Sequence, residues 1–202
     1  MRRPAVFWID VAVKVALVGL LAFGAFSGLQ QFDGKAFGAR LATYPLALVV
    51  VPVTWWIWAR GSPYPYAVDI LLGLPFLIDV LGNTFDLYDT IDRWDDLNHF
   101  VNWAILTSAF AQFLLRLRPP LARWVLFGLT VGFGAVTAVL WEFGEYVAFI
   151  RHSDELRTAY TDTLGDLALG LSGSVLAATI AVVLAGRRRL SATAPEQRRM
   201  PR

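Results

Sequence analysis

The chain has 202 residues, of which 56% are hydrophobic and only 17% charged, with eight tryptophans and no cysteine. A soluble domain of this length cannot hide so much apolar surface, so the composition excludes an ordinary soluble fold and predicts an all-α, polytopic membrane protein. The absence of cysteine excludes disulfides and thiolate ligands. The net charge of +2 comes largely from arginines near the chain ends and in one short loop. This distribution is typical of membrane proteins, so no nucleic-acid partner is expected.

Six segments are long and apolar enough to cross a membrane, since a spanning helix needs about 20 mostly apolar residues. They are residues 5–29, 42–59, 66–85, 96–115, 124–150 and 161–185. The prediction is a single transmembrane domain over residues 1–190, followed by a disordered, basic, cytoplasmic tail over residues 191–202. Pro75 is expected to kink the third segment.

Lysine and arginine are unequally divided between the two ends of these predicted helices. Most of them lie before the first segment, between the fourth and fifth segments, and after the sixth. Positively charged loops favour the cytoplasmic side, so the N- and C-termini are both predicted to be cytoplasmic. The connections after the first, third and fifth segments then face outward.

The first predicted helix carries two opposite charges, Asp10 and Lys14. Their i,i+4 spacing places them on one helix face, where each neutralises the other. The simpler interpretation is a pair that reaches the membrane surface without any role in chemistry.

Polar residues recur at the outward end of the later segments. Asp96, His99 and Asn102 lie at the start of the fourth segment, with Asp95 just before it. Glu142 and Glu145 lie near the end of the fifth, and Asp162 and Asp166 at the start of the sixth. Asp79 and Asn83 lie near the end of the third, with Asp86 just after it. Within each helix these residues are three or four positions apart and so share a face. Charges at a membrane edge are costly unless paired, hydrated or bound to an ion, so this end is a candidate functional site. Asp95, Asp96 and Asp162 are also placed to cap helix starts, which is their structural alternative.

One imidazole and several carboxylates form a reasonable ligand set for a divalent metal ion, here Mg²⁺, Mn²⁺, Ca²⁺ or Zn²⁺. The first-choice ligands are His99, Glu142 and Asp166, and Asp95, Asp96 and Asp162 are additional ligands or their supports. Glu145, with Glu142, is the candidate for general-base catalysis. Asp79, Asn83 and Asn102 are assigned to substrate contact or proton relay. Glycines at 128, 132, 134, 165, 170 and 173 are expected to allow close helix packing.

The three motifs, in the order Asp95-Asp96-Leu97-Asn98-His99, Trp141-Glu142-Phe143-Gly144-Glu145 and Asp162-Thr163-Leu164-Gly165-Asp166, resemble the YjdF-type inner-membrane proteins of bacteria. They are more distantly similar to VanZ-like membrane proteins. The resemblance covers roughly residues 69–174 and implies a multi-pass protein of the bacterial cytoplasmic membrane, without implying an activity. VanZ-like proteins are linked with tolerance to glycopeptide antibiotics, but they tend to carry a glutamine where this chain has Glu145.

Three functions are compatible with this sequence. The favoured one is a metal-dependent enzyme acting on a lipid or lipid-linked head group at the outer face. A second is a proton- or cation-coupled transporter, although the inward halves of the last three segments have almost no ionisable groups. The third is a non-catalytic envelope or antibiotic-tolerance protein that binds a ligand. The sequence gives no prediction of oligomeric state.

Overall fold

The computed structural model describes residues 4–116, 120–148 and 150–193, and every regular element in these ranges is helical. The long helices are α1 (Ala5–Phe26), α2 (Phe37–Thr54), α3 (Tyr66–Thr84), α5 (Trp94–Leu114), α6 (Arg123–Ala148) and α7 (Ala159–Thr193). The short ones are η1 (Gln30–Phe32), η2 (Trp55–Ala59), α4 (Leu87–Thr90), η3 (Ile150–His152) and η4 (Asp154–Arg157). The predicted all-α fold class is confirmed.

Five segments of the described chain are long and apolar enough to cross a membrane. They are Ala5–Phe26, Phe37–Ala59, Tyr66–Thr84, Arg123–Ala148 and Ala159–Arg187. The remaining long helix, α5, has 21 residues but carries Asn98, His99 and Asn102 in its first half. Asn98 and His99 are buried, and α5 packs against α7, α3 and α6. The polar residues that lower the apolarity of α5 therefore lie largely inside the bundle.

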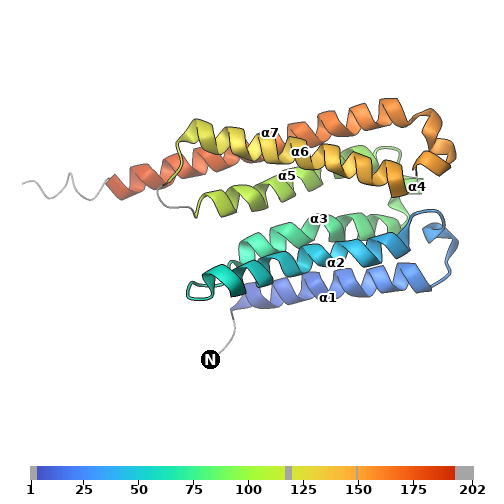
Figure 1. The fold of residues 1–202 in the computed structure, drawn as a ribbon, viewed down its shortest axis with the longest axis horizontal. Coiled ribbons are helices and arrows are strands. Elements are labelled where there is room, and N and C mark those ends of the chain that lie inside the picture. The colour runs from blue at the N-terminus through green and yellow to red at the C-terminus, as the bar shows by residue number, and fades with distance from the viewer. Residues whose placement is uncertain (1–3, 117–119, 149, 194–202) are drawn as a thin grey trace, which may run out of the picture.

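The long helices lie side by side and alternate in direction (Figure 1). One group contains α1, α2 and α3, and a second contains α5, α6 and α7; α3 and α5 make most of the contact between the groups. The start of α1 and the end of α7 lie at the same end of the bundle (Figure 1). This arrangement gives the molecule two distinct ends, each of which gathers polar groups from several helices.

Some helix limits differ from the predicted ones. α2 begins at Phe37 rather than at residue 42, and it therefore includes Arg40. α3 continues as a helix through Pro75. α7 extends to Thr193, so the first residues of the predicted disordered tail are helical, and residues 194–202 of that tail lie outside the described residues.

Small residues bring α7 close to α5 and α6, but only some of the predicted glycines take part. A Cβ atom on Gly173 would overlap the backbone oxygen of Phe100, and one on Gly170 would lie 2.5 Å from Trp103 Cδ1. Gly134 on α6 lies directly against Ser174 on α7. The expectation fails for three glycines, at positions 128, 132 and 165, where an added Cβ would meet nothing within 4 Å. Packing of this kind is a main source of helix association in a membrane, where lipid is as apolar as the side chains.

Candidate functional site

Four helix ends meet at one end of the bundle. α3 and α6 end there, and α5 and α7 begin there (Figure 1). Because the predicted polar motifs occupy these four ends, the antiparallel arrangement gathers them. The polar residues at these ends are Asp79 and Asn83 on α3, Asp95, His99 and Asn102 on α5, Glu142 and Glu145 on α6, and Asp162 and Asp166 on α7.

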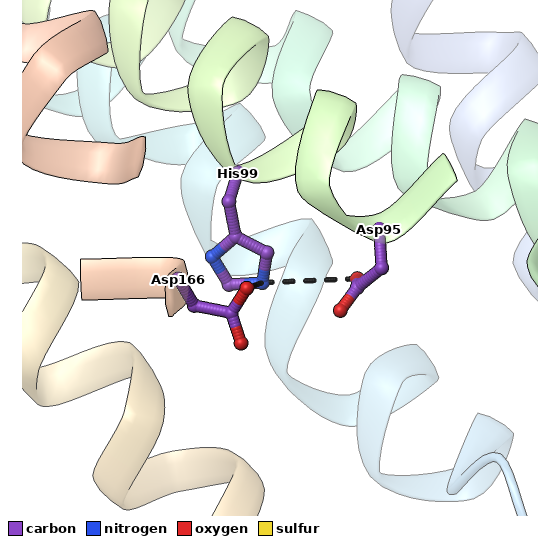
Figure 2. Close-up of side chains that lie close together, drawn as sticks. All are labelled: Asp95, His99 and Asp166. Atoms are coloured by element: carbon purple, nitrogen blue, oxygen red, sulfur yellow. Dashed lines mark ion pairs between the residues drawn. The ribbon is translucent and has the colours of Figure 1, made fainter. Parts of the chain in front are cut away.

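His99 lies among carboxylates from three helices. Its Nε2 atom is 3.7 Å from Oδ1 of Asp95, one turn earlier on α5, and 3.7 Å from Oδ1 of Asp166 on α7 (Figure 2). Its Nδ1 atom is 3.8 Å from Oε1 of Glu142 on α6. These separations exceed normal hydrogen-bond lengths. Nδ1 is buried and has no hydrogen-bond partner among the described residues.

The imidazole ring divides the predicted ligands into two groups. In the first, His99, Asp95 and Asp166 each offer a ligand atom within 4.8 Å of the others; in the second, His99 does so with Glu142 and Glu145. The two ring nitrogens point in different directions, so one ion bound to His99 can reach only one of these groups. In the structure, Asp95 rather than Glu142 forms a group with His99 and Asp166.

Burial makes the mutual repulsion of these carboxylates unfavourable. His99, Glu142 and Asp166 are buried, whereas the side chain of Asp95 is 49% exposed. Several carboxylates in a partly desolvated place repel one another unless a proton or a cation neutralises them. Asp95 and His99 both line a cavity at this end of the bundle.

The two remaining predicted ligands, Asp96 and Asp162, are exposed. Neither belongs to the two groups found among the described residues, although Asp162 lines the cavity beside them. The N-cap of α5 is Arg93, without a side-chain capping bond, and Asp95 and Asp96 lie in the first turn. Their negative charge there stabilises the helix start through its dipole rather than by capping.

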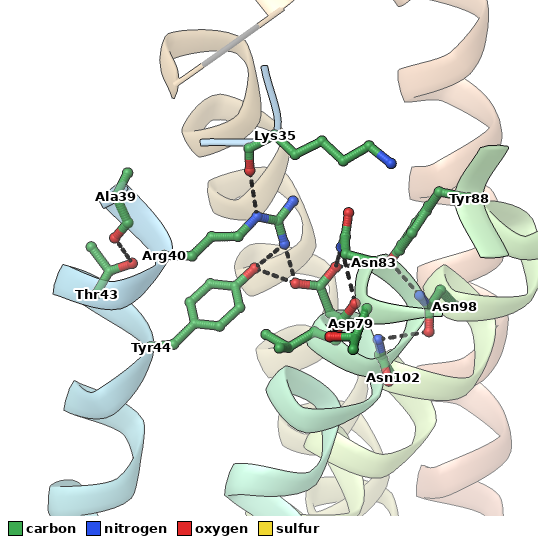
Figure 3. Close-up of polar contacts among 12 residues, drawn as sticks. Lys35, Ala39, Arg40, Thr43, Tyr44, Asp79, Asn83, Tyr88, Asn98 and Asn102 are labelled. Carbon is green, nitrogen blue, oxygen red and sulfur yellow. Dashed lines mark hydrogen bonds and ion pairs between the residues drawn. The ribbon is translucent and has the colours of Figure 1, made fainter. Parts of the chain in front are cut away.

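Asp79 is held by donors from three elements (Figure 3). Its Oδ2 atom accepts hydrogen bonds from Arg40 and from the Tyr44 hydroxyl at 2.6 Å, both on α2. Its Oδ1 atom accepts from the Tyr88 hydroxyl on α4 at 2.8 Å and from Asn83 Nδ2 at 3.4 Å. Each oxygen of Asp79 therefore accepts two hydrogen bonds, and the carboxylate links α2, α3 and α4.

The network continues from Tyr88 into α5. Asn98 donates to the Tyr88 hydroxyl, and Asn102 Nδ2 donates to Asn98 Oδ1 at 3.1 Å. Burial raises the pKa of Tyr88 above its ordinary value, and the nearby charge of Asp79 acts in the same direction. Tyr88 therefore remains a neutral donor that connects Asp79 to the polar start of α5.

Arg40, Tyr44 and Tyr88 are the members of this network that sequence reasoning missed. Arg40 and Tyr44 are four residues apart on α2 and bond to each other as well as to Asp79. The predicted start of the second helix at residue 42 left Arg40 in a loop and concealed this spacing. A search for a cation and a phenol at i,i+4 would have found the pair.

A cavity of about 760 Å³ lies between the Asp79 network and the His99 carboxylates. Lys35 and Arg40 line it on the α2 side, and Asp95, His99 and Glu145 line it on the side of α5 and α6. Its lining also includes the apolar side chains Pro75, Phe76, Trp103, Leu106 and Trp141. Leu106 is seven residues beyond His99 on α5, so at 1.5 Å per residue the cavity lining extends about 10 Å further into the bundle. The cavity is therefore polar near the helix ends and apolar within the bundle.

An all-helical chain with several helices able to cross a membrane, and with a polar site at one end, defines a multi-pass membrane protein. The chain belongs to a family of predicted membrane proteins, DUF2238, whose model matches residues 12–187. This membership is consistent with the YjdF-type resemblance, and the VanZ-like resemblance stays a prediction. No curated protein and no solved structure matches the chain.

Proposed function

We propose that this protein is a metal-dependent enzyme of the bacterial cytoplasmic membrane that acts on a lipid or lipid-linked head group. The observation that carries the proposal is the position of His99 Nε2, 3.7 Å from a carboxylate oxygen of Asp95 and 3.7 Å from one of Asp166. Small side-chain movements would bring all three atoms to metal-ligand distances of about 2.0–2.2 Å. A mixed set of nitrogen and carboxylate ligands suits Mn²⁺ or Zn²⁺ better than Mg²⁺ or Ca²⁺.

The orientation of the site is part of the proposal. We count α5 as a sixth membrane span, because it has 21 residues and is surrounded by α3, α6 and α7. We place both termini in the cytoplasm, because most lysines and arginines lie at that end of the helices. The site then lies at the outer face of the membrane, within reach of head groups in the outer leaflet.

The cavity supports an amphiphilic substrate. A polar head group would lie at the polar end beside His99, and the first carbons of an attached chain would contact the apolar lining formed by Phe76, Trp103 and Trp141. Lys35 and Arg40 also line the cavity, but each is paired with an aspartate. A metal ion beside His99 would therefore supply the charge that attracts an anionic head group such as a lipid phosphate or a lipid-linked phosphate.

The acids on α6 take supporting roles. Glu142 lies 3.8 Å from His99 Nδ1. After a small movement, it could accept a hydrogen bond from a proton on Nδ1 and so fix the orientation of the ring. Glu145 lines the cavity and is the candidate to take a proton from an attacking water or hydroxyl group. Metal binding at Nε2 would supply a Lewis acid for a phosphoryl or carbonyl oxygen.

The test is the metal content of the detergent-purified protein after loading with Mn²⁺ or Zn²⁺ and removal of the excess. We expect about one ion per chain in the wild type and a loss of at least tenfold in affinity in Asp166→Asn and in His99→Ala. Asp96→Asn is the matched control, because it removes the same charge from an exposed position beside Asp95 and should retain the ion. Equal metal binding by all four proteins, or none by any of them, contradicts the proposal.

Activity is tested separately, by release of phosphate or head group from lipid phosphates in mixed micelles. Metal binding without any turnover in this screen would favour the binding-protein alternative. Folded carboxylate variants that lose thermal stability but bind no less metal would favour a structural role for these acids.

Transport is the second candidate, because buried ionisable groups occur near both ends of α3, at Asp69 and at Asp79. Proteoliposomes containing the protein would then show a proton or cation flux. Four donors already bond to the carboxylate of Asp79, which argues against Asp79 as the group that carries the proton or cation. Asp79→Asn is therefore expected to lower the stability of the protein as well as any flux.

A further inference from the structure

A second group of buried charges lies at the opposite end of α3 from the cavity. Lys14 Nζ on α1 is 3.2 Å from Asp10 Oδ2 and 2.5 Å from Asp69 Oδ2. Asp10 is 5% exposed and Asp69 is 1% exposed. The predicted pairing of Asp10 with Lys14 is present, but α3 adds a second carboxylate that the spacing within α1 could not reveal. We call Asp10, Lys14 and Asp69 the inner triad.

The inner triad has more acceptors than donors. Oδ1 of Asp10 and Oδ1 of Asp69 are both buried and have no hydrogen-bond partner among the described residues. Fully ionised, two carboxylates and one ammonium would leave one negative charge in a desolvated place, which is unfavourable. A further positive charge between or beside the carboxyl groups would both bind the two unpartnered oxygens and neutralise the excess negative charge.

Among the described residues, the aromatic side chains beside the inner triad do not supply that charge. The Tyr64 hydroxyl donates to Asp69 Oδ2. Burial raises the pKa of Tyr64, and its bond to Asp69 acts in the same direction, so it is neutral. The rings of Tyr66 and Tyr64 are tilted against each other with centroids 4.7 Å apart, and the ring of Trp55 from η2 lies 5.2 Å from that of Tyr64. These neighbours contribute rings and a hydroxyl rather than a cation.

The number of free oxygens distinguishes a proton from a metal ion. Hard metal cations in proteins gather about six or more oxygen ligands, whereas the inner triad offers two unpartnered oxygens, and Lys14 already occupies the space beside the other two. A proton needs only one oxygen to bind and a second to accept its hydrogen bond.

We propose that the inner triad is a proton-binding site in which Asp10 and Asp69 together hold one proton beside Lys14 at neutral pH. A hydronium ion transfers its proton to one carboxylate and leaves as water, so the inner triad becomes neutral. The side chain of Lys14 is 23% exposed, so the described helices do not enclose the inner triad completely. The site is separate from the His99 group and does not depend on metal binding there.

The test is infrared spectroscopy of the full chain in detergent, with aspartate labelled by ¹³C at its side-chain carboxyl carbon. A protonated carboxyl has a carbonyl stretch that is distinct from the carboxylate bands and shifts in D₂O. We expect this signal at about pH 7 in the wild type. It should fall by the equivalent of one carboxyl group in Asp10→Asn and in Asp69→Asn, because each variant leaves a neutral pair with Lys14.

Two controls separate the inner triad from other acids. Asp92→Asn changes an exposed loop acid, and Asp166→Asn changes the proposed metal site; both should keep the signal assigned to the inner triad. Absence of any protonated aspartate in the wild type overturns the proposal without requiring a variant. It is also overturned if folded Asp10→Asn and Asp69→Asn keep the full signal, or if sodium chloride removes that signal at constant pH.

Discussion

Replacing Gly173 with alanine should push α7 away from α5. The new Cβ would overlap the backbone oxygen of Phe100 and lie 3.0 Å from the backbone nitrogen of Ala104. Backbone atoms in the middle of a helix cannot rotate away as a side chain can, so the two helices must separate. Overpacking of this kind typically costs about 1–3 kcal/mol. Alanine also has a better helix propensity than glycine by up to about 1 kcal/mol, so we expect a net loss of up to about 2 kcal/mol.

The same displacement should weaken the candidate metal site. Gly173 lies seven residues beyond Asp166, two turns along the same face of α7, and Phe100 directly follows His99. Separation of the helices therefore lengthens the 3.7 Å distance between His99 Nε2 and Asp166 Oδ1. Gly173→Ala should lower the thermal unfolding temperature in detergent and also weaken Mn²⁺ or Zn²⁺ binding, even though it removes no ligand.

Gly132→Ala is the matched control for this prediction. Gly132 is also within a long helix, but an added Cβ there meets nothing within 4 Å. It should leave stability unchanged or raise it slightly, and metal binding should be retained. Equal unfolding temperatures for the two alanine variants would refute the close approach of α5 and α7 on which the reasoning depends.

Three further changes test other parts of the fold. Asp79→Asn leaves the largely buried guanidinium of Arg40 without its counter-charge and should lower the free energy of unfolding by about 3–5 kcal/mol, measured by denaturation in detergent. Thr107→Val removes a fully buried 3.0 Å hydrogen bond to α7 and should cost about 0.6–1.7 kcal/mol, again by denaturation; no measurable change would mean that packing alone holds this contact. The hydrogen bond from Lys35 lowers the pKa of Asp89, so this pair stabilises the protein above the ordinary carboxyl pKa of 3.8 and loses its effect as the pH falls through the lowered value. Asp89→Asn should therefore reduce the loss of thermal stability on acidification, and an unchanged pH profile would refute a contribution from the pair.

Much of the fold follows from the periodic and apolar character of the sequence. The long apolar segments were enough to place the first three helices approximately, because each helix satisfies its own backbone hydrogen bonds and needs no distant partner. α5 was identified by length, although Asn98, His99 and Asn102 make it less apolar than the others. The tertiary structure explains why α5 carries these polar residues, since its buried side chains face other helices.

The candidate site was partly accessible from the sequence. The alternating direction of the helices was enough to predict that His99, Glu142 and Asp166 lie at the same end of the bundle. The rotation of each helix about its own axis could not be predicted from the sequence. Residue spacing shows which residues share a helix face, but it does not show which neighbouring helix that face contacts. The choice of Asp95 over Asp96 beside His99, and the presence of Arg40 and Tyr44 at Asp79, depend on those rotations.

The sequence by itself determined the class of protein, the approximate helices and the end of the bundle at which polar groups gather, because hydrophobicity and charge act locally along the chain. Tertiary structure alone decided which acids share a space. It joined Asp69 to Asp10 and Lys14, although 55 residues separate Lys14 from Asp69, and it placed Asp95 and Asp166 on one side of the His99 ring with Glu142 on the other. Such pairings depend on how helices approach and turn toward one another, and close contacts such as that of Gly173 with the backbone of α5 set that geometry.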